Sequence, residues 1–231
     1  MDEDYYYFVR EYLVSANVGI KDIEFSHISI EEYFGSNESD LVEKIRKEMI
    51  AENLWIKVVE DRNGRLISVL RKDDVIEVVE LLFVHESKGQ KISFTLDMES
   101  DGTRRLFDLI PILFQARSKE TTFFVDEMER SIHPSLIHQL LLKFSQNWKT
   151  KGQIILSTHE TSLLDQDIFR RDEIWFVEKD KNGSTDLYPL SDFKEHHTKN
   201  IRNGYLSGRY GGIPFLGDLE KLNYNQDAIT E

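Results

Sequence analysis

The sequence predicts an α/β fold in which a mainly parallel sheet is flanked by helices, with an antiparallel β insertion between about residues 54 and 98. Two runs, 121–125 and 153–156, indicate the parallel strands, because the first is rich in β-branched and aromatic residues and the second is Ile-Ile-Leu after a glutamine. A helical pattern lies between them, and strand, helix, strand is the order of a parallel βαβ unit. The pair Asn63-Gly64 between two β-prone runs indicates a hairpin and hence the antiparallel part.

The first 53 residues are predicted to form two helices and one strand. A helical pattern over residues 4–14 ends near Gly19, which suits a left-handed helix cap. Apolar residues alternate over 19–25, as in a half-buried strand. Over 36–53, apolar residues recur at helical spacing among charges, which predicts an amphipathic surface helix.

The pattern changes again near Ser100. The insertion holds strands predicted at 54–59, 66–70, 75–85 and 92–96, whereas residues 104–117 and 135–148 show helical spacing. A second hairpin is expected around Asn182-Gly183, between strands at 173–178 and 186–190. We therefore expect four parts: 1–53, the β insertion 54–98, a core lobe 99–195, and a C-terminal extension 196–231 with a frayed tail.

The composition limits the kinds of function. The 231 residues carry a formal net charge of −13, which argues against a surface built mainly for nucleic acid, because duplex binding depends on Lys and Arg. The chain has no cysteine, so disulfides and thiolate metal sites are excluded. It has neither the ~20-residue apolar run of a membrane span nor the start of a signal peptide. We expect a cytoplasmic protein with no membrane partner.

Polar side chains follow both predicted parallel strands at the point where each ends. Asp126 and Glu127 follow the first strand, and Ser157-Thr158-His159 follows the second. The carboxyl ends of neighbouring parallel strands meet at one edge of a sheet, where ligands bind. At such an edge an Asp can hold Mg²⁺ and its waters, a Glu can orient or deprotonate a water, and a His can contact a terminal phosphate. The sequence therefore predicts metal-assisted phosphate chemistry.

These residues resemble the motifs of ABC-type ATPases. Phe123-Phe124-Val125-Asp126-Glu127 is similar to their Walker B motif, and Ser157-Thr158-His159 to their switch-histidine strand. Ser131-Ile132-His133-Pro134 occupies the place of the D-loop, and Glu99-Ser100-Asp101-Gly102-Thr103 resembles a degenerate signature motif. The wording of these motifs, with that of the late run 204–214, is most similar to bacterial AAA15/AAA21-type ATPases, the RloA-like group near restriction and phage-defence genes among them. The resemblance implies the head lobe of an ABC-type P-loop NTPase.

The resemblance also implies roles for single residues. Asp126 would be the Mg²⁺ ligand, and Glu127 and His159 the catalytic residues. The nucleotide of a second subunit would meet the start of a helix at Ser100, Gly102 and Thr103, whose N–H groups and dipole favour phosphate. Ser131 and His133 would complete the nucleotide site and carry communication across the dimer. The implied cofactors are ATP and Mg²⁺.

One motif of these ATPases does not occur in the sequence. A P-loop (Walker A) needs Gly-x-x-x-x-Gly-Lys followed by Ser or Thr, and no glycine here is followed by lysine. The resemblance thus covers the C-terminal portion of such an ATPase, and we expect the chain alone to hydrolyse ATP negligibly. The expected partners are a Walker A segment or subunit, a second copy in an ATP-sandwiched homodimer, and a nuclease or other defence effector.

Two other functions are compatible with the same residues. One is a degenerate head lobe that dimerises or docks a partner without turnover. The other is a magnesium phosphohydrolase or Toprim-like nuclease, which would need more acids near Asp126 than Glu127 and Glu129 supply, since alternate residues on a strand point apart. In plainer interpretations, Ser100 is only a helix N-cap and Glu129 only a surface acid.

Overall fold

The computed structural model describes residues 3–147, 149–194 and 200–213. The chain divides into two compact units. The first comprises the described residues of Met1–Val125, Arg130–His133 and Thr150–Leu156. The second comprises those of Asp126–Glu129, Pro134–Lys149 and Ser157–Glu231. The predicted extension, 196–231, lies mostly outside the described residues.

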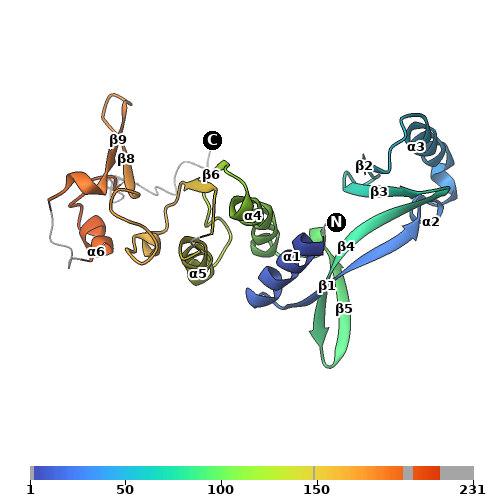
Figure 1. Cartoon of the computed structure of the whole chain (residues 1–231), viewed down its shortest axis with the longest axis horizontal. Coiled ribbons are helices and arrows are strands. Elements are labelled where there is room, and N and C mark those ends of the chain that lie inside the picture. The colour runs from blue at the N-terminus through green and yellow to red at the C-terminus, as the bar shows by residue number, and fades with distance from the viewer. Residues whose placement is uncertain (1–2, 148, 195–199, 214–231) are drawn as a thin grey trace, which may run out of the picture. The chain divides into compact units, whose positions relative to one another are not determined.

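An antiparallel sheet of five strands dominates the first unit. Its order is β1 (Ile20–Ser29), β4 (Val75–Ser87), β3 (Leu66–Lys72) and β2 (Ile56–Glu60), and β5 (Gln90–Thr95) also pairs with β4. The long strands β1 and β4 run side by side, with Phe25 opposite Leu81 (Figure 1). Because β1 precedes residue 54, the antiparallel sheet extends on both sides of the predicted start of the insertion.

The described residues do not form the mainly parallel sheet that the sequence predicts. Only β6 (Thr122–Val125) and β7 (Gln153–Leu156) pair in parallel there. Short hairpin turns make β2–β3, β3–β4 and β4–β5 antiparallel neighbours, whereas a parallel pair needs a crossover of a dozen or more residues. Such a crossover joins β6 to β7, through α5 (Pro134–Ser145). The chain is therefore α/β, with its parallel part confined to the strands that precede the predicted site.

Two helices cover one face of the large sheet. The helices α2 (Ile30–Phe34) and α3 (Ser39–Ala51) follow β1, and the Ser29 hydroxyl accepts a hydrogen bond from the Glu32 N–H at the start of α2 (3.1 Å). The buried side chains of α3 recur at spacings of three and four, as the sequence predicts for an amphipathic helix. Together with the sheet they form one apolar cluster: Ile30, Phe34, Val42, Ile45, Met49, Ile67, Val69, Ile76 and Val78.

The helix α1 (Glu3–Ser15) packs against β1 and α4 (Asp101–Ser118). Its Phe8 ring meets the Phe114 ring of α4 edge to face, with centroids 5.2 Å apart, and the Arg117 guanidinium lies 5.1 Å from the Phe8 centroid. The Tyr6 hydroxyl donates to the carbonyl of Ile23 (3.0 Å). The aromatic cluster near the N-terminus is thus packing surface, and it ties β1 to the helix that begins at the signature-like residues.

The second unit has a smaller core of its own. The hairpin strands β8 (Trp175–Lys179) and β9 (Thr185–Pro189) pack on α6 (Ile201–Leu206) through the cluster Ile174, Phe176, Leu190, Ile201 and Tyr210. Phe176 stacks on Tyr205 and Tyr210, each with centroids 5.6 Å apart. Burial raises the pKa of Tyr188 to about 12, together with the Glu178 carboxylate, which accepts a hydrogen bond from the Tyr188 hydroxyl. Among the described residues, no helix combines the length and apolar character of a membrane span.

Both hairpins turn on the same sequence, Asp-x-Asn-Gly, as predicted. In the β2–β3 turn, Asp61 Oδ1 accepts from the backbone N–H groups of Asn63 (2.8 Å) and Arg65 (2.9 Å), and Gly64 takes a φ of 75°. Asp180 makes the same two contacts in the β8–β9 turn. Local side-chain bonds and a left-handed glycine therefore determine both turns.

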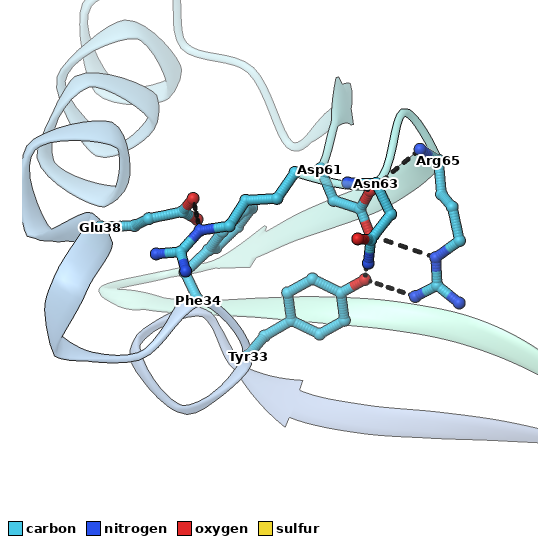
Figure 2. A pocket seen from close by; sticks show the side chains of 7 residues that line it. Tyr33, Phe34, Glu38, Asp61, Asn63 and Arg65 are labelled. Atoms are coloured by element: carbon cyan, nitrogen blue, oxygen red, sulfur yellow. Dashed lines mark hydrogen bonds and ion pairs between the residues drawn. The ribbon is translucent and has the colours of Figure 1, made fainter.

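The β2–β3 turn also borders a hollow of about 260 Å³ (Figure 2). The Tyr33 hydroxyl donates to Asp61 (3.1 Å) and accepts from Arg65 (2.8 Å), whose Nε also donates to Asp61 (3.1 Å). The hollow is lined by Tyr33, Phe34, Glu38, Asp61, Arg62, Asn63 and Arg65. The backbone N–H of Arg65, with its side chain and the Tyr33 hydroxyl, lowers the pKa of Asp61 to about 2.

This pKa predicts a loss of stability in acid. An Asp has an ordinary pKa of about 3.9, so a native-state pKa of about 2 stabilises the fold above pH ~4, and this stabilisation disappears as the pH falls through 2. We expect the urea midpoint to fall less between pH 4 and pH 2 in Asp61→Asn than in the unchanged chain. Asp180→Asn, at the equivalent turn position, is the control. Equal acid sensitivity of Asp61→Asn and the unchanged chain contradicts this prediction.

Candidate functional site

The two predicted acids lie in an exposed loop directly after β6. Asp126 and Glu127 are both solvent exposed, and Glu127 has a φ of 45°, in the left-handed region. A non-glycine residue there costs roughly 1–2 kcal/mol, and such strain is common at functional sites. The next residue, Met128, is only 1% exposed. The loop is therefore fixed by a buried methionine while it presents both carboxylates to solvent.

Ser157, the first residue after β7, joins the loop after β6 (residues 126–129, the acid loop) to the segment that carries His159 (residues 157–159, the histidine segment). Its hydroxyl donates to Asp126 Oδ1 and accepts from the Glu127 backbone N–H (3.0 Å). Its carbonyl accepts from the Met128 N–H (3.2 Å). These bonds continue the parallel pairing of β6 and β7 beyond the strand ends. The predicted meeting of the two strand ends at one edge is therefore present.

The switch-like histidine is held through its backbone. The His159 N–H donates to Glu129 Oε1 (2.8 Å), while the residue as a whole is exposed. Burial of Glu129 would raise its pKa, but the N–H groups of His159 and of Glu129 itself, the Thr158 hydroxyl and the nearby His159 hold that pKa below its usual value. Glu129 is half-buried and accepts a tertiary hydrogen bond, so it is more than an isolated surface acid. Its position two residues after Glu127 was the sequence signal for it.

Ser157 should matter for stability as well as for the site. In Ser157→Ala the Asp126 carboxylate and the Glu127 N–H lose their shared partner, and we expect the free energy of unfolding to fall by about 1 kcal/mol. Ser157→Thr, which keeps a hydroxyl, should lose less. Urea unfolding of the two variants measures the difference, and equal losses contradict the assigned bonds.

The signature-like residues begin α4 in the first unit. The Ser100 side chain accepts from the Thr103 N–H (3.1 Å), so Ser100 is the N-cap that its residue type predicts. Thr103 is 2% exposed, and its hydroxyl lies 3.0 Å from the Ser100 hydroxyl. The Thr103 side chain thus supports the turn from inside, and its contact with a ligand stays a prediction.

Gly102 brings the signature-like turn against the D-loop-like segment. A Cβ at Gly102 would lie 2.5 Å from the Ser131 carbonyl oxygen, closer than real Cβ contacts come. Ser131 itself has a φ of 63°, in the left-handed region. Only a glycine fits at residue 102 without displacing the loop. The sequence placed both residues in the site but gave no sign that their backbones touch.

The predicted site residues fall in both units. Ser100, Gly102, Thr103, Ser131 and His133 belong to the first, and Asp126, Glu127 and His159 to the second. His133 is exposed and directly precedes Pro134, the first residue of α5. Its predicted role in communication between subunits is not tested by the geometry of the chain.

A comparison with family models identifies the chain. The model described as "AAA domain, putative AbiEii toxin, Type IV TA system" matches residues 4–165. The chain belongs to this family. A search of curated proteins gives no match. Membership of this AAA family indicates a nucleotide-binding, ATPase-like domain. The matched range includes the signature-like turn, the acid loop and His159, whereas the β8–β9 hairpin follows it.

The donor set of the acid loop suits one kind of metal site. The described residues contain no group of three or more His, Asp or Glu side chains that could enclose a metal ion. Mg²⁺ needs no such cage, since it commonly binds through one or two carboxylates, several waters and substrate phosphates. The exposed Asp126 carboxylate, next to the Ser157 hydroxyl, fits this mode of binding.

Proposed function

We propose that the chain is the C-terminal lobe of an ABC-type ATPase of the RloA-like kind, which binds and hydrolyses ATP with Mg²⁺ at a head-to-head dimer interface. One observation carries this proposal: the hydrogen-bonded junction at the ends of β6 and β7, where Ser157 and Glu129 hold the acid loop and His159 together. A chance pair of acids after a strand would not explain why the histidine segment is attached to the same loop.

In this proposal the acid loop divides the chemical work between its two carboxylates. Asp126 would hold Mg²⁺, and the ion would supply charge neutralisation for the phosphates. Glu127 orients the attacking water and accepts its proton. The exposed His159 side chain contacts the terminal phosphate. The strained φ of Glu127 fits a residue whose direction is set by function.

The start of α4 is proposed to face the nucleotide of a second subunit. A helix of 18 residues carries partial positive charge at its N-terminus, which favours a phosphate there. Ser100 caps this end, and the close approach of Gly102 and Ser131 connects it to the D-loop-like segment. Ser131 and His133 would then transmit dimer closure to the lobe.

An uncovered apolar surface supports a partner that completes the sheet. Phe124 and Ile155 are register partners on one face of the parallel pair, and they are 78% and 44% exposed. Parallel sheets are normally buried on both faces, and two strands alone are marginally stable. We propose that a segment or subunit bearing the Walker A motif covers this face and supplies the lysine and amides that this sequence does not contain.

The test of the proposed function is reconstitution. The chain alone should hydrolyse ATP negligibly, and mixing or fusing it with a Walker A segment of the same family should produce magnesium-dependent turnover. Turnover by the purified chain alone, abolished by Glu127→Gln, would show that no partner is needed. If reconstituted ATPase activity is unaffected by changes at Asp126 and Glu127, the lobe is a non-catalytic interaction module.

The remaining partners follow from the ATPase cycle. Closure of a homodimer around ATP would drive a nuclease or another defence effector, and nothing in the net charge of −13 favours direct nucleic-acid binding. The alternative of a standalone phosphohydrolase or Toprim-like nuclease has less support, because it needs further acids near Asp126 and the described residues contain no acid cluster of that kind.

A further inference from the structure

Glu129 is a carboxylate to which the ATPase motifs give no role, yet it touches the segment that carries the switch-like histidine. It lies in the same loop as Asp126 and Glu127, and 30 residues separate it from His159 along the chain. Its Oε1 accepts from the His159 backbone N–H at 2.8 Å. The contact is therefore tertiary, and it acts on the main chain at the very residue whose ring is exposed.

The bond completes a series that joins two loops. Ser157 makes three bonds to residues 126–128, and the next residue, Glu129, adds a fourth bond, to the residue two positions after Ser157. Beyond His159 the next bonds come from outside the acid loop: the Glu160 N–H donates to Thr158 (3.0 Å), the Ser162 N–H donates to Glu160 (2.8 Å), and Arg202 donates to the Thr161 hydroxyl (3.2 Å). Glu129 is thus the contact through which the acid loop determines where the His159 backbone lies.

We propose that Glu129 is a positioning residue, which holds the His159 backbone so that its imidazole is presented to the terminal phosphate beside Glu127. This inference rests on the proposed ATPase function for its last step. A backbone bond leaves the ring free to meet a ligand, whereas a bond to the ring would compete with one. A carboxylate suits the task because bonds from N–H groups to an ionised acceptor are stronger than bonds to a neutral one.

The first arm of the test uses the full chain without any partner. Amide hydrogen exchange of His159, measured by NMR, should be about fivefold faster in Glu129→Ala, because one hydrogen bond of about 1 kcal/mol is lost. Glu129→Gln keeps an oxygen acceptor and should restore most of the protection. Glu160→Ala is the matched control, since it removes a neighbouring carboxylate that accepts a backbone bond from Ser162 and not from His159.

The second arm uses the chain reconstituted with a Walker A segment. Glu129→Ala should lower kcat about ten- to a hundredfold with KM unchanged, as expected for a displaced catalytic group, and Glu129→Gln should recover most of it. A general loss of fold would lower kcat equally in Glu129→Ala and Glu129→Gln, and it would be visible in urea unfolding. Glu160→Ala should leave kcat within about twofold.

The two arms separate the inference from the proposed function. Unchanged exchange at His159 in Glu129→Ala overturns the positioning role, whether or not the assembly hydrolyses ATP. Faster exchange with unchanged kcat also overturns it, since His159 would then not need its position. If the assembly without substitutions does not hydrolyse ATP, the proposed function is refuted. Hydrogen exchange then tests the Glu129–His159 hydrogen bond by itself.

Discussion

Glu127→Gln is expected to lower the ATP turnover of the reconstituted assembly at least about a hundredfold. General-base or water-orienting groups typically contribute 10²–10⁴ in rate, about 3–5 kcal/mol of barrier. The amide keeps the size of the side chain and can still accept a hydrogen bond, but it cannot take a proton. The backbone of residue 127, held by Ser157, should not move. A single-turnover measurement with ATP and Mg²⁺ reports the loss directly.

Nucleotide binding distinguishes a catalytic role from a structural one. Glu127→Gln should bind ATP as tightly as the unchanged assembly or more tightly, because it removes one negative charge near the phosphates. Asp126→Asn should weaken the dependence of binding on Mg²⁺ instead. If Glu127→Gln hydrolyses ATP at the normal rate, Glu127 has no catalytic role, and the alternative of a non-catalytic interaction module is favoured.

Gly102→Ala is expected to destabilise the first unit by about 2 kcal/mol and to reduce reconstituted turnover as well. The new methyl would lie 2.5 Å from the Ser131 carbonyl oxygen, which is backbone and cannot rotate away like a side chain. Forcing an extra methyl into a packed contact typically costs 1–3 kcal/mol. Because Ser131 is already in the left-handed conformation, its loop has little freedom to move away from the new methyl group. Urea unfolding of the chain alone measures the effect.

The neighbouring residue supplies the control for this substitution. Asp101 is in the same first turn of α4, its side chain is 77% exposed, and it pairs with Arg104 at 2.6 Å. Such an exposed pair is worth little, so Asp101→Ala should change the free energy of unfolding by no more than about 0.5 kcal/mol. If Gly102→Ala proves as stable as Asp101→Ala, the backbone contact with Ser131 is not as close as described.

Local chemistry explains why much of the site could be predicted from the sequence. Ser100 caps α4 because a serine hydroxyl reaches the N–H three residues on. Two apolar runs joined by a helical segment pair in parallel, so that Asp126 and Ser157 follow neighbouring strand ends. Each of these outcomes depends on residue type and spacing within a short stretch of chain.

Other features depend on which distant segments meet, and no local pattern contains that information. The antiparallel pairing of β1 with β4 extends the large sheet across the predicted boundary near residue 54. The sequence alone assigns no role to Glu129, and only the folded chain brings its carboxylate to the His159 N–H. In the sequence Gly102 is an ordinary residue near the start of a helix, and only the structure shows that the Ser131 carbonyl lies against it.

By itself the sequence determined the four longest helices (α1, α3, α4 and α5), the two Asp-x-Asn-Gly hairpins, the Ser100 cap and the strands that end in acid and histidine. These follow from side-chain periodicity and from hydrogen bonds between residues at most four apart. Only the tertiary structure decided how the sheet is paired, which loop holds the His159 backbone, and why residue 102 is glycine. Those features arise from contacts between residues about 30 or more positions apart, whose geometry exists only once the chain has folded.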